Sequence, residues 1–347
     1  MQHTDFDAIF IVGNSRSGTT MMSRILGIEP SVFRFNELHF FDELWSSKDK
    51  DYINSTEAEQ LFIRLLCIQR TSYLHQKNPG SFSNEVKDII ASIGTHSLTP
   101  INIFKAFLQY ETLKNEKTIP CEQTGRNIFY IAEILENFSK ARIINMIRDP
   151  RAVLLSQKYK WKRGLMGANI PRNEMIRSWF NYSPITISMI YKAAVQTADR
   201  FATNPRVYSL YYEELLNNPE HNVRNICNFT GLTYSDNLLA IPNIGSSNKK
   251  DEPDRKGIDK ERTKSWQIGG LNTAEIYLCQ TINKKVMLKH NYNFVHINPN
   301  IIKLTYYLIS FPIKSIIAFF LNLKRMKNIR NSISRRLRAY SKSSTSI

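Results

Sequence analysis

Short apolar runs alternate with longer segments of helical periodicity along most of the chain. The apolar runs predict strands at residues 8–12, 32–35, 142–147 and 207–211. Apolar residues recurring every three or four positions predict helices at residues 19–26, 57–73, 84–93, 103–113, 127–136, 175–200 and 222–229. Strands that alternate with helices are typical of a parallel sheet covered on both faces. We therefore predict an α/β fold with a central parallel sheet flanked by helices.

The pattern changes after residue 300. Residues 301–323 are largely apolar, interrupted by Lys303, Pro312 and Lys314, and residues 324–338 are rich in Lys and Arg. We therefore divide the chain into a domain of residues 1–300 and a helical C-terminal tail of residues 301–347, apolar and then basic. A spanning helix is disfavoured because charge at bilayer depth is costly, whereas a helix lying in the interface lets its lysines snorkel.

Three interpretations of this tail remain open. The apolar part can lie on a membrane while the basic part meets anionic lipid. Alternatively, it is a helix packed on the body and followed by a solvated basic extension. Nucleic-acid binding is the third, but no aromatic platform or binding motif favours it, and we predict no nucleic-acid partner.

Composition indicates a globular chain, and the charge is unevenly placed. The chain has 347 residues, of which 42% are hydrophobic, enough for a substantial core. The net charge is +17. Ten basic and no acidic residues follow position 300, which leaves 17 − 10 = +7 for the first 300 residues. The body itself is only mildly basic.

The four cysteines, at positions 67, 121, 227 and 279, have neither zinc-site spacing nor the pattern of a disulfide framework. A reducing compartment fits them. The first ten residues lack the basic start and apolar run of a secretory signal. These features predict a cytoplasmic protein without a metal, peripheral at the cytoplasmic face of the membrane if the tail binds lipid.

The first predicted strand runs into a glycine-bounded turn, Gly13-Asn-Ser-Arg-Ser-Gly-Thr-Thr20. Gly13 and Gly18 have the spacing of a Walker A loop, but Thr19 occupies the position of its lysine, and the cation is Arg16 inside the turn. Backbone N–H groups and the start of the following helix still favour an anion. The loop is thus suited to phosphate but poorly suited to ATP.

A second loop follows the strand at residues 142–147. It places Arg148 at the strand end and Ser156 about two turns into the helix that Pro150 begins. Ligands of open parallel sheets bind beyond the carboxyl ends of the strands. We therefore expect Arg148, Ser156 and the glycine loop to converge on one anion.

The two loops together, GNSRSGTT and IRDPRAVLLS, resemble those of the sulfotransferases that use 3′-phosphoadenosine 5′-phosphosulfate (PAPS). The resemblance covers residues 6–292 and implies a P-loop-like sulfotransferase fold. It implies that Arg148 and Ser156 hold the 3′-phosphate of the donor. The residues that it places around the 5′-phosphosulfate are Ser15, Arg16, Ser17, Gly18, Thr19 and Thr20.

The phrase Asn36-Glu-Leu-His-Phe-Phe-Asp42 resembles the Glu-x-His-Phe-Phe of heparan sulfate sulfotransferases. This resemblance implies that Glu37 is the catalytic base, and we expect the adjacent phenylalanines, Phe40 and Phe41, to raise its pKa. His39 is the alternative base, or it orients Glu37. Tyrosylprotein sulfotransferases resemble the arginine form of the loop, and there we assign Arg16 electrostatic stabilisation of the leaving phosphate only.

The chain departs from the family at Gln123, where many saccharide sulfotransferases have a lysine. Arg126 or a residue of the basic loop at 244–264 is expected to replace that charge. By resemblance to cytosolic relatives, the phrase Arg255-Lys256-Gly257 contacts the nucleotide, and a solvated loop is the alternative. Beside the donor helix, Lys158, Lys160, Trp161, Lys162 and Arg163 form a basic edge suited to an anionic or sugar-like acceptor.

These observations predict a PAPS-dependent sulfotransferase that acts on a hydroxyl without a metal. We expect a saccharide, a glycolipid or another cell-surface compound as the acceptor. A P-loop kinase is the rival enzyme, but the chain lacks its lysine and its magnesium-binding acids. A membrane-associated, non-catalytic adaptor with a degenerate nucleotide fold is the other alternative.

Overall fold

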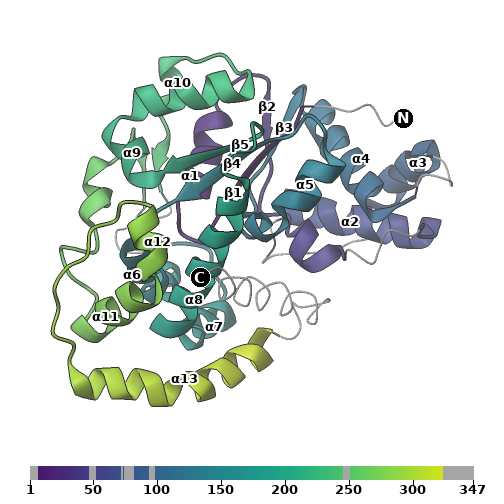
Figure 1. The fold of residues 1–347 in the computed structure, drawn as a ribbon. Coiled ribbons are helices and arrows are strands. Elements are labelled where there is room, and N and C mark those ends of the chain that lie inside the picture. The colour runs from purple at the N-terminus through teal and green to yellow at the C-terminus, as the bar shows by residue number, and fades with distance from the viewer. Residues whose placement is uncertain are drawn as a thin grey trace.

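A five-stranded parallel sheet forms the centre of the computed structural model, which describes residues 7–46, 52–71, 73, 82–93, 98–244 and 251–322 (Figure 1). All neighbouring strands in it are parallel. Its spatial order is β2 (Val32–Arg34), β3 (Ile119–Glu122), β1 (Ile9–Gly13), β4 (Arg142–Ile147) and β5 (Val207–Tyr211). The predicted fold class is confirmed.

Strand β1 connects two hydrophobic cores because successive side chains of a strand point to opposite faces. Ile9 and Ile11 belong to the core shared with α1 (Thr19–Leu26) and α10 (Pro219–Thr230). Phe10 and Val12 belong to the other core. That core is shared with α2 (Ser55–Thr71), α3 (Ser83–Ile93), α4 (Pro100–Lys114) and α5 (Ile131–Asn137).

Two elements differ from the prediction. Strand β3 was not expected, because its sequence Ile-Pro-Cys-Glu is short and carries a proline. The single helix predicted at residues 175–200 is two helices, α7 (Arg172–Phe180) and α8 (Pro184–Ala198). The break arises because a residue before proline avoids helical geometry, and here Ser183 is extended and caps α8 by accepting from the Thr186 N–H.

Two further regions differ from the prediction in their secondary structure. One predicted helix consists of two segments, and one predicted loop contains a strand and a 3₁₀ turn. The predicted helix at residues 127–136 begins as a 3₁₀ turn, Gly125–Tyr130, and continues as α5. The region expected to be a loop at 244–264 contains β7 (Glu252–Lys256), which pairs antiparallel with β6 (Pro242–Asn243), and a 3₁₀ turn, Lys260–Lys264. Its residues 245–250 lie outside the described part of the chain.

Beyond the carboxyl ends of the strands lies a second layer of helices (Figure 1). These are α6 (Pro150–Lys158), a 3₁₀ turn at Lys160–Met166, α7, α8, α11 (Thr273–Ile282) and α12 (Lys284–Lys289). The short α9 (Tyr212–Asn217) follows β5.

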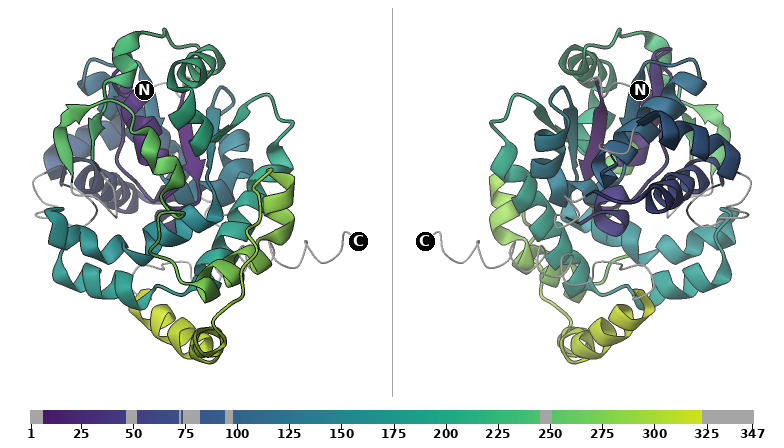
Figure 2. Two further views of the ribbon diagram at one scale, coloured as in Figure 1. Left: turned by 90° about the vertical axis from the view of Figure 1, so that its left-hand side faces the viewer. Right: turned by 90° about the vertical axis from the view of Figure 1, so that its right-hand side faces the viewer.

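Helix α13 (Ile301–Asn322) is the outermost element, at the edge of the molecule away from the sheet (Figure 2). It packs on α7, α8 and α11. Among the described residues it is the one helix that is long and apolar enough to cross a membrane, judged by length and composition. The basic part of the predicted tail, from residue 323, lies outside the described residues.

Candidate functional site

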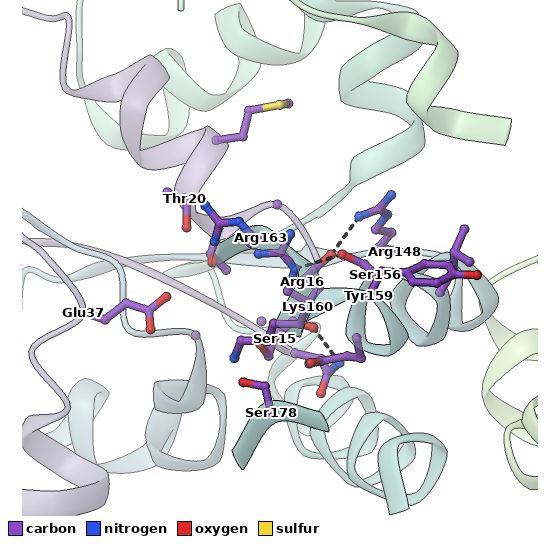
Figure 3. Close-up of a pocket in the computed structure, with 18 of the residues that line it drawn as sticks. Ser15, Arg16, Thr20, Glu37, Arg148, Ser156, Tyr159, Lys160, Arg163 and Ser178 are labelled. Atoms are coloured by element: carbon purple, nitrogen blue, oxygen red, sulfur yellow. Dashed lines mark hydrogen bonds between the residues drawn. The ribbon is translucent and has the colours of Figure 1, made fainter. Parts of the chain in front are cut away.

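A cavity of about 1520 Å³ lies at the carboxyl ends of β1 and β4, between the glycine loop, the segment after α6, and helices α7, α8 and α13 (Figure 3). This volume exceeds that of a typical single-ligand pocket, so it has room for two ligands. Nine Arg or Lys side chains and five acidic side chains line it among the described residues, which favours anionic ligands. The cationic ones are Arg16, Arg24, Arg126, Arg148, Lys160, Lys162, Arg163, Arg177 and Arg262.

The glycine loop approaches the chain around it so closely that its glycines are required. Gly18 has a φ of +100°, and a Cβ there would lie 2.5 Å from the ring of Tyr212. Gly18 is also the N-cap of α1 and offers no side-chain cap. The first N–H groups of α1 therefore form the kind of helix start that binds anions.

The two predicted anion loops meet at Arg16. Arg16 has a φ of +75°, an uncommon conformation for a residue with a side chain. Its Nε donates to the Ser156 hydroxyl at 2.9 Å, and Arg148 Nη1 donates to its carbonyl oxygen at 2.9 Å (Figure 3). The structure thus brings Arg148 and Ser156 beside the glycine loop, as expected from the strand order.

Arg148 is fixed by two aromatic residues that the sequence analysis did not single out. Its guanidinium lies 4.3 Å from the centre of the Tyr212 ring, and its carbonyl accepts from the Tyr191 hydroxyl at 2.7 Å. Arg148 Nε and the Ser17 hydroxyl are buried without a hydrogen-bond partner among the described residues. Buried polar groups of this kind normally have partners, and Arg148, which lines the cavity, can find one in a phosphate-bearing ligand, whereas Ser17 is not among the lining residues.

The cations of the cavity lower one another's pKa. Burial and the charges of Arg163 and Arg148 lower the pKa of Arg16 to about 10, so it remains charged at neutral pH. Burial and the charge of Arg16 lower the pKa of Lys160 to about 8, against the opposing effect of Glu37. An anion bound here would relieve this repulsion.

Glu37 lies on the opposite side of the cavity from Arg16, on the segment that follows β2, and its carboxylate points into the cavity (Figure 3). The segment is anchored at three residues around Glu37. Asn36 donates two hydrogen bonds of 2.8 Å to Gln69, the Leu38 N–H donates to Glu122, and the His39 N–H donates to Thr124. These contacts hold the Glu37 backbone while its side chain stays 48% exposed.

A row of alternating charges orients Glu37. His39 Nε2 lies 3.5 Å from the Glu37 carboxylate and Nδ1 lies 3.2 Å from Asp42, which Arg126 contacts at 3.1 Å. Burial alone would lower the pKa of His39, but Asp42 and Glu37 outweigh it and raise the pKa to about 10. His39 is therefore protonated at neutral pH, which suits it to orient Glu37 rather than to accept a proton.

The predicted rise in the pKa of Glu37 was wrong, because the structure lowers this pKa. Burial does raise it, but the hydrogen bond and charge of His39, with the charges of Lys160 and Arg126, hold the pKa below its usual value. Phe40 and Phe41 point into the core, where Phe40 stacks on Phe104 at 4.0 Å. Glu37 is thus kept ionised by its neighbours.

A buried carboxyl group supports the same segment from below. Glu122, at the end of β3, accepts from Asn127 at 2.6 Å and from the N–H and hydroxyl of Thr124. Burial, only partly offset by the Thr124 and Leu38 hydrogen bonds, raises its pKa to about 7. Glu122 therefore positions the Glu37 segment without facing the ligand space.

The remaining predicted residues divide between the cavity and the surface. Ser15, Thr19, Thr20, Gln123 and Gly257 line the cavity. In contrast, Arg255 and Lys256 lie on the exposed strand β7, where Arg255 pairs with Glu252 at 3.4 Å.

The residues of the basic edge after α6 also lie in two different places. Lys160, Trp161, Lys162 and Arg163 line the cavity, whereas Lys158 pairs with Glu275 at 2.8 Å. Arg262 of the predicted basic loop lines the cavity as well, whereas sequence reasoning missed Arg24 and four residues of α13 as lining residues. These four are Ser315, Ala318, Phe319 and Asn322.

The fold and the site define a class, an α/β protein with an anion-binding glycine loop of P-loop type. Comparison with known proteins then gives the family. The model of the sulfotransferase family matches residues 8–236, and the chain belongs to that family. It is accordingly a transferase. The search of curated proteins gave no match.

Two solved sulfotransferase domains share the fold. The sulfotransferase domain from the olefin synthase of Synechococcus PCC 7002 is 17% identical over 85% of this chain and 98% of its own, with a TM-score of 0.52. The sulfotransferase domain from the curacin biosynthetic pathway is 16% identical over 84% of this chain and 99% of its own, with a TM-score of 0.51. Retinol dehydratase, solved with retinol and PAP, is 12% identical over 83% of each chain, with a TM-score of 0.36.

Proposed function

We propose that this sulfotransferase moves the sulfuryl group of PAPS onto a hydroxyl group of its acceptor. The observation that carries the proposal is the contact between the two anion loops, in which Arg16 bonds Ser156 and Arg148 bonds the Arg16 carbonyl. Two phosphate sites on adjacent loops match a donor with phosphate at both its 5′ and 3′ positions. The partnerless Nε of Arg148, which lines the cavity, supports the same assignment.

In this assignment, Ser15 to Thr20 and the start of α1 hold the 5′ side of the donor, while Arg148 and Ser156 hold its 3′-phosphate. When bound, the donor supplies an electrophilic sulfur and a phosphate leaving group. Arg16 neutralises charge on the phosphate side. Its guanidinium is suited to this because it forms charge-assisted hydrogen bonds and stays charged in a site that excludes water.

Glu37 is the proposed base. It is ionised at neutral pH, its carboxylate faces the cavity, and it takes the proton of the acceptor hydroxyl as the oxygen–sulfur bond forms. His39, held between Glu37 and Asp42, fixes the carboxylate's orientation. Because a carboxylate of low pKa is a weak base, its contribution depends on position as much as on basicity.

Lys160 is the proposed second cation near the sulfuryl group, in place of the lysine absent at Gln123. Its charge interacts with Arg16 on one side and Glu37 on the other. The expected substitutes are engaged elsewhere: Arg126 contacts Asp42, and Arg262 of the basic loop contacts Asn243. A cation between base and leaving group stabilises charge that develops in the transition state.

For the acceptor, we propose a saccharide, a glycolipid or another cell-surface hydroxyl compound, because the cavity is rich in cations and carries Trp161 at its basic edge. We also propose a cytoplasmic protein, peripheral at the cytoplasmic face of the membrane. The four cysteines support a reducing compartment, since all of them are buried as free thiols.

A transfer assay with ³⁵S-labelled PAPS and a panel of acceptor classes tests the function. Glu37→Gln should lower kcat by about 10²- to 10⁴-fold, the usual contribution of a general base, while leaving the affinity for 3′,5′-phosphoadenosine unchanged. Glu43→Gln is the matched control. Glu43 also lines the cavity, but its carboxylate accepts from the Tyr73 hydroxyl at 2.8 Å, so its loss should change kcat little. Wild-type kcat in Glu37→Gln would refute the base assignment.

A further inference from the structure

Helix α13 is oriented opposite to an ordinary surface helix, which buries its apolar face and exposes its polar one. Its polar side chains bond to the body. Tyr307 bonds Asn272 and Glu275, Lys314 bonds the Tyr182 carbonyl, and Asn322 bonds Arg177 and Asn181. The polar face of α13 is therefore the one that faces the protein.

The outward face is apolar. Ile302, Ile309, Ile313, Ile316 and Phe320 are spaced by seven, four, three and four residues, which places them along one side of the helix. Ile302 is 82% exposed and Ile309 is 68% exposed. Helix α7, which packs on α13, exposes two further apolar residues, Ile176 and Trp179. An exposed apolar helix face of this length marks an interaction site.

Charge indicates what this surface contacts. The chain after position 300 has ten basic residues and no acidic one, and Lys303 is exposed on α13 itself. A second copy would bring like charges together, whereas an anionic bilayer meets both the apolar face and the cations. A spanning helix would remove the body from the polar side chains Tyr307, Lys314 and Asn322 and leave them in hydrocarbon.

The same helix is a wall of the cavity. Ser315, Ala318 and Asn322 line it from the inner face of α13, opposite Arg177 and Ser178 of α7. Phe319 belongs to both surfaces, since it lines the cavity and is 37% exposed. The apolar surface and the cavity are therefore continuous at this residue.

We infer that α13 rests on an anionic bilayer and admits an acceptor that stays attached to its lipid chains, with its hydroxyl-bearing head group entering the cavity past Phe319. This inference rests on the proposed sulfotransferase activity. In the transfer, the head-group oxygen bonds to sulfur, its proton passes to Glu37, and the sulfur–oxygen bond to phosphate breaks with its electron pair remaining on the phosphate. The chains need not leave the bilayer.

The membrane contact is tested by flotation of the full chain with vesicles of phosphatidylcholine alone or of phosphatidylcholine and phosphatidylglycerol in equal parts. We expect binding to the anionic vesicles, lowered at least about tenfold in Ile309→Glu/Ile316→Glu. Leu113→Glu/Leu288→Glu adds the same charge at exposed leucines of α4 and α12 and should bind as wild type does. Retained binding in the α13 variant, or a wild-type dimer that the α13 variant loses, would overturn the inference.

The acceptor class is tested with ³⁵S-labelled PAPS and one batch of cells of the source organism, divided into lipid-extract vesicles and an aqueous extract. We expect label in the lipid, reduced at least about tenfold in the α13 variant, while calorimetry shows unchanged affinity for 3′,5′-phosphoadenosine. Label confined to the aqueous extract would overturn the inference but leave the proposed function standing. Label in neither fraction would overturn the proposed function, and the inference with it.

Discussion

The two sides of the cavity are built in different ways. On the donor side, Arg16, Arg148 and Ser156 lie on two short loops that follow neighbouring strands, and Gly13 pairs with Met146 in the register that brings those loops together. On the acceptor side, the walls come from α7, α8 and α13, and α13 contacts both other helices outside the sheet. The donor side is thus fixed by strand register, whereas the acceptor side depends on helix packing, which tolerates more variation.

The difference predicts where a substitution has its largest effect. Arg16→Ala removes the cation at the centre of the donor side and should lower kcat by about 10²- to 10³-fold, as loss of one transition-state donor does. Steady-state kinetics with ³⁵S-labelled PAPS measures it. Arg16→Lys is the matched variant, because it keeps the charge and the same backbone demand at a φ of +75°. A loss in Arg16→Ala no greater than in Arg16→Lys would show that the positive charge by itself contributes nothing, and would overturn the electrostatic role.

Arg148→Ala should break nucleotide selectivity rather than chemistry. The wild-type protein should bind 3′,5′-phosphoadenosine more tightly than 5′-AMP. In the variant, the ratio of the two affinities should fall about 10- to 100-fold, because one charge-assisted hydrogen bond contributes about that factor. Calorimetry with both nucleotides measures the ratio. Equal affinities in the wild-type protein would remove the donor assignment.

In Arg148→Ala, a lost contact with the 3′-phosphate must be distinguished from a loosened loop structure. Arg148 also packs on Tyr212 and bonds the Arg16 carbonyl, so its removal loosens the loop. Arg148→Lys retains a cation and should keep part of the preference. A uniform loss of affinity for both nucleotides in Arg148→Ala would indicate a disordered loop instead of a lost 3′-phosphate contact.

Lys160 links the two sides, and its effect should appear in the pH profile. Since its pKa is lowered to about 8, Lys160 loses its charge as the pH rises through that value, and kcat/KM should fall there. In Lys160→Arg the alkaline fall should move upward, because arginine stays protonated, while activity at neutral pH is largely kept. An unchanged alkaline limb in this variant would assign the fall to another group.

Sequence reasoning succeeded where the chemistry is local and failed where it is assembled from distant segments. The glycine loop and the Arg148 loop are contiguous phrases at strand ends, so sheet topology was enough to place them together. Tyr212 was not predicted as a site residue, because nothing in its sequence context shows that its ring lies against both Gly18 and Arg148. The polar side of α13 faces the body because single hydrogen bonds hold it there, and a hydropathy pattern carries no sign of them.

The pKa of Glu37 shows the same limit. Its two phenylalanine neighbours in sequence suggested a desolvated carboxyl group, but their rings turn into the core. The groups that decide its ionisation are His39, Lys160 and Arg126, and the last two come from distant segments. The phenylalanines therefore did not predict its environment, because the charges that outweigh burial are brought near only by the folded chain.

His39→Gln should have the smallest effect, a shift of the acidic limb of the pH profile. The folded pKa of Glu37 is lowered by His39, so the carboxylate stays ionised, and the base active, until the pH falls through that low value. In the variant the charge and much of the hydrogen bond are lost while the burial remains. The acidic limb of the pH profile should therefore move to higher pH, with kcat at neutral pH reduced only a few-fold.

Asp42→Asn is the companion variant, since it frees His39 from its other partner and leaves the contact with Glu37 in place. An acidic limb that does not move in His39→Gln would mean that Glu37 is held ionised by the cations of the acceptor side alone.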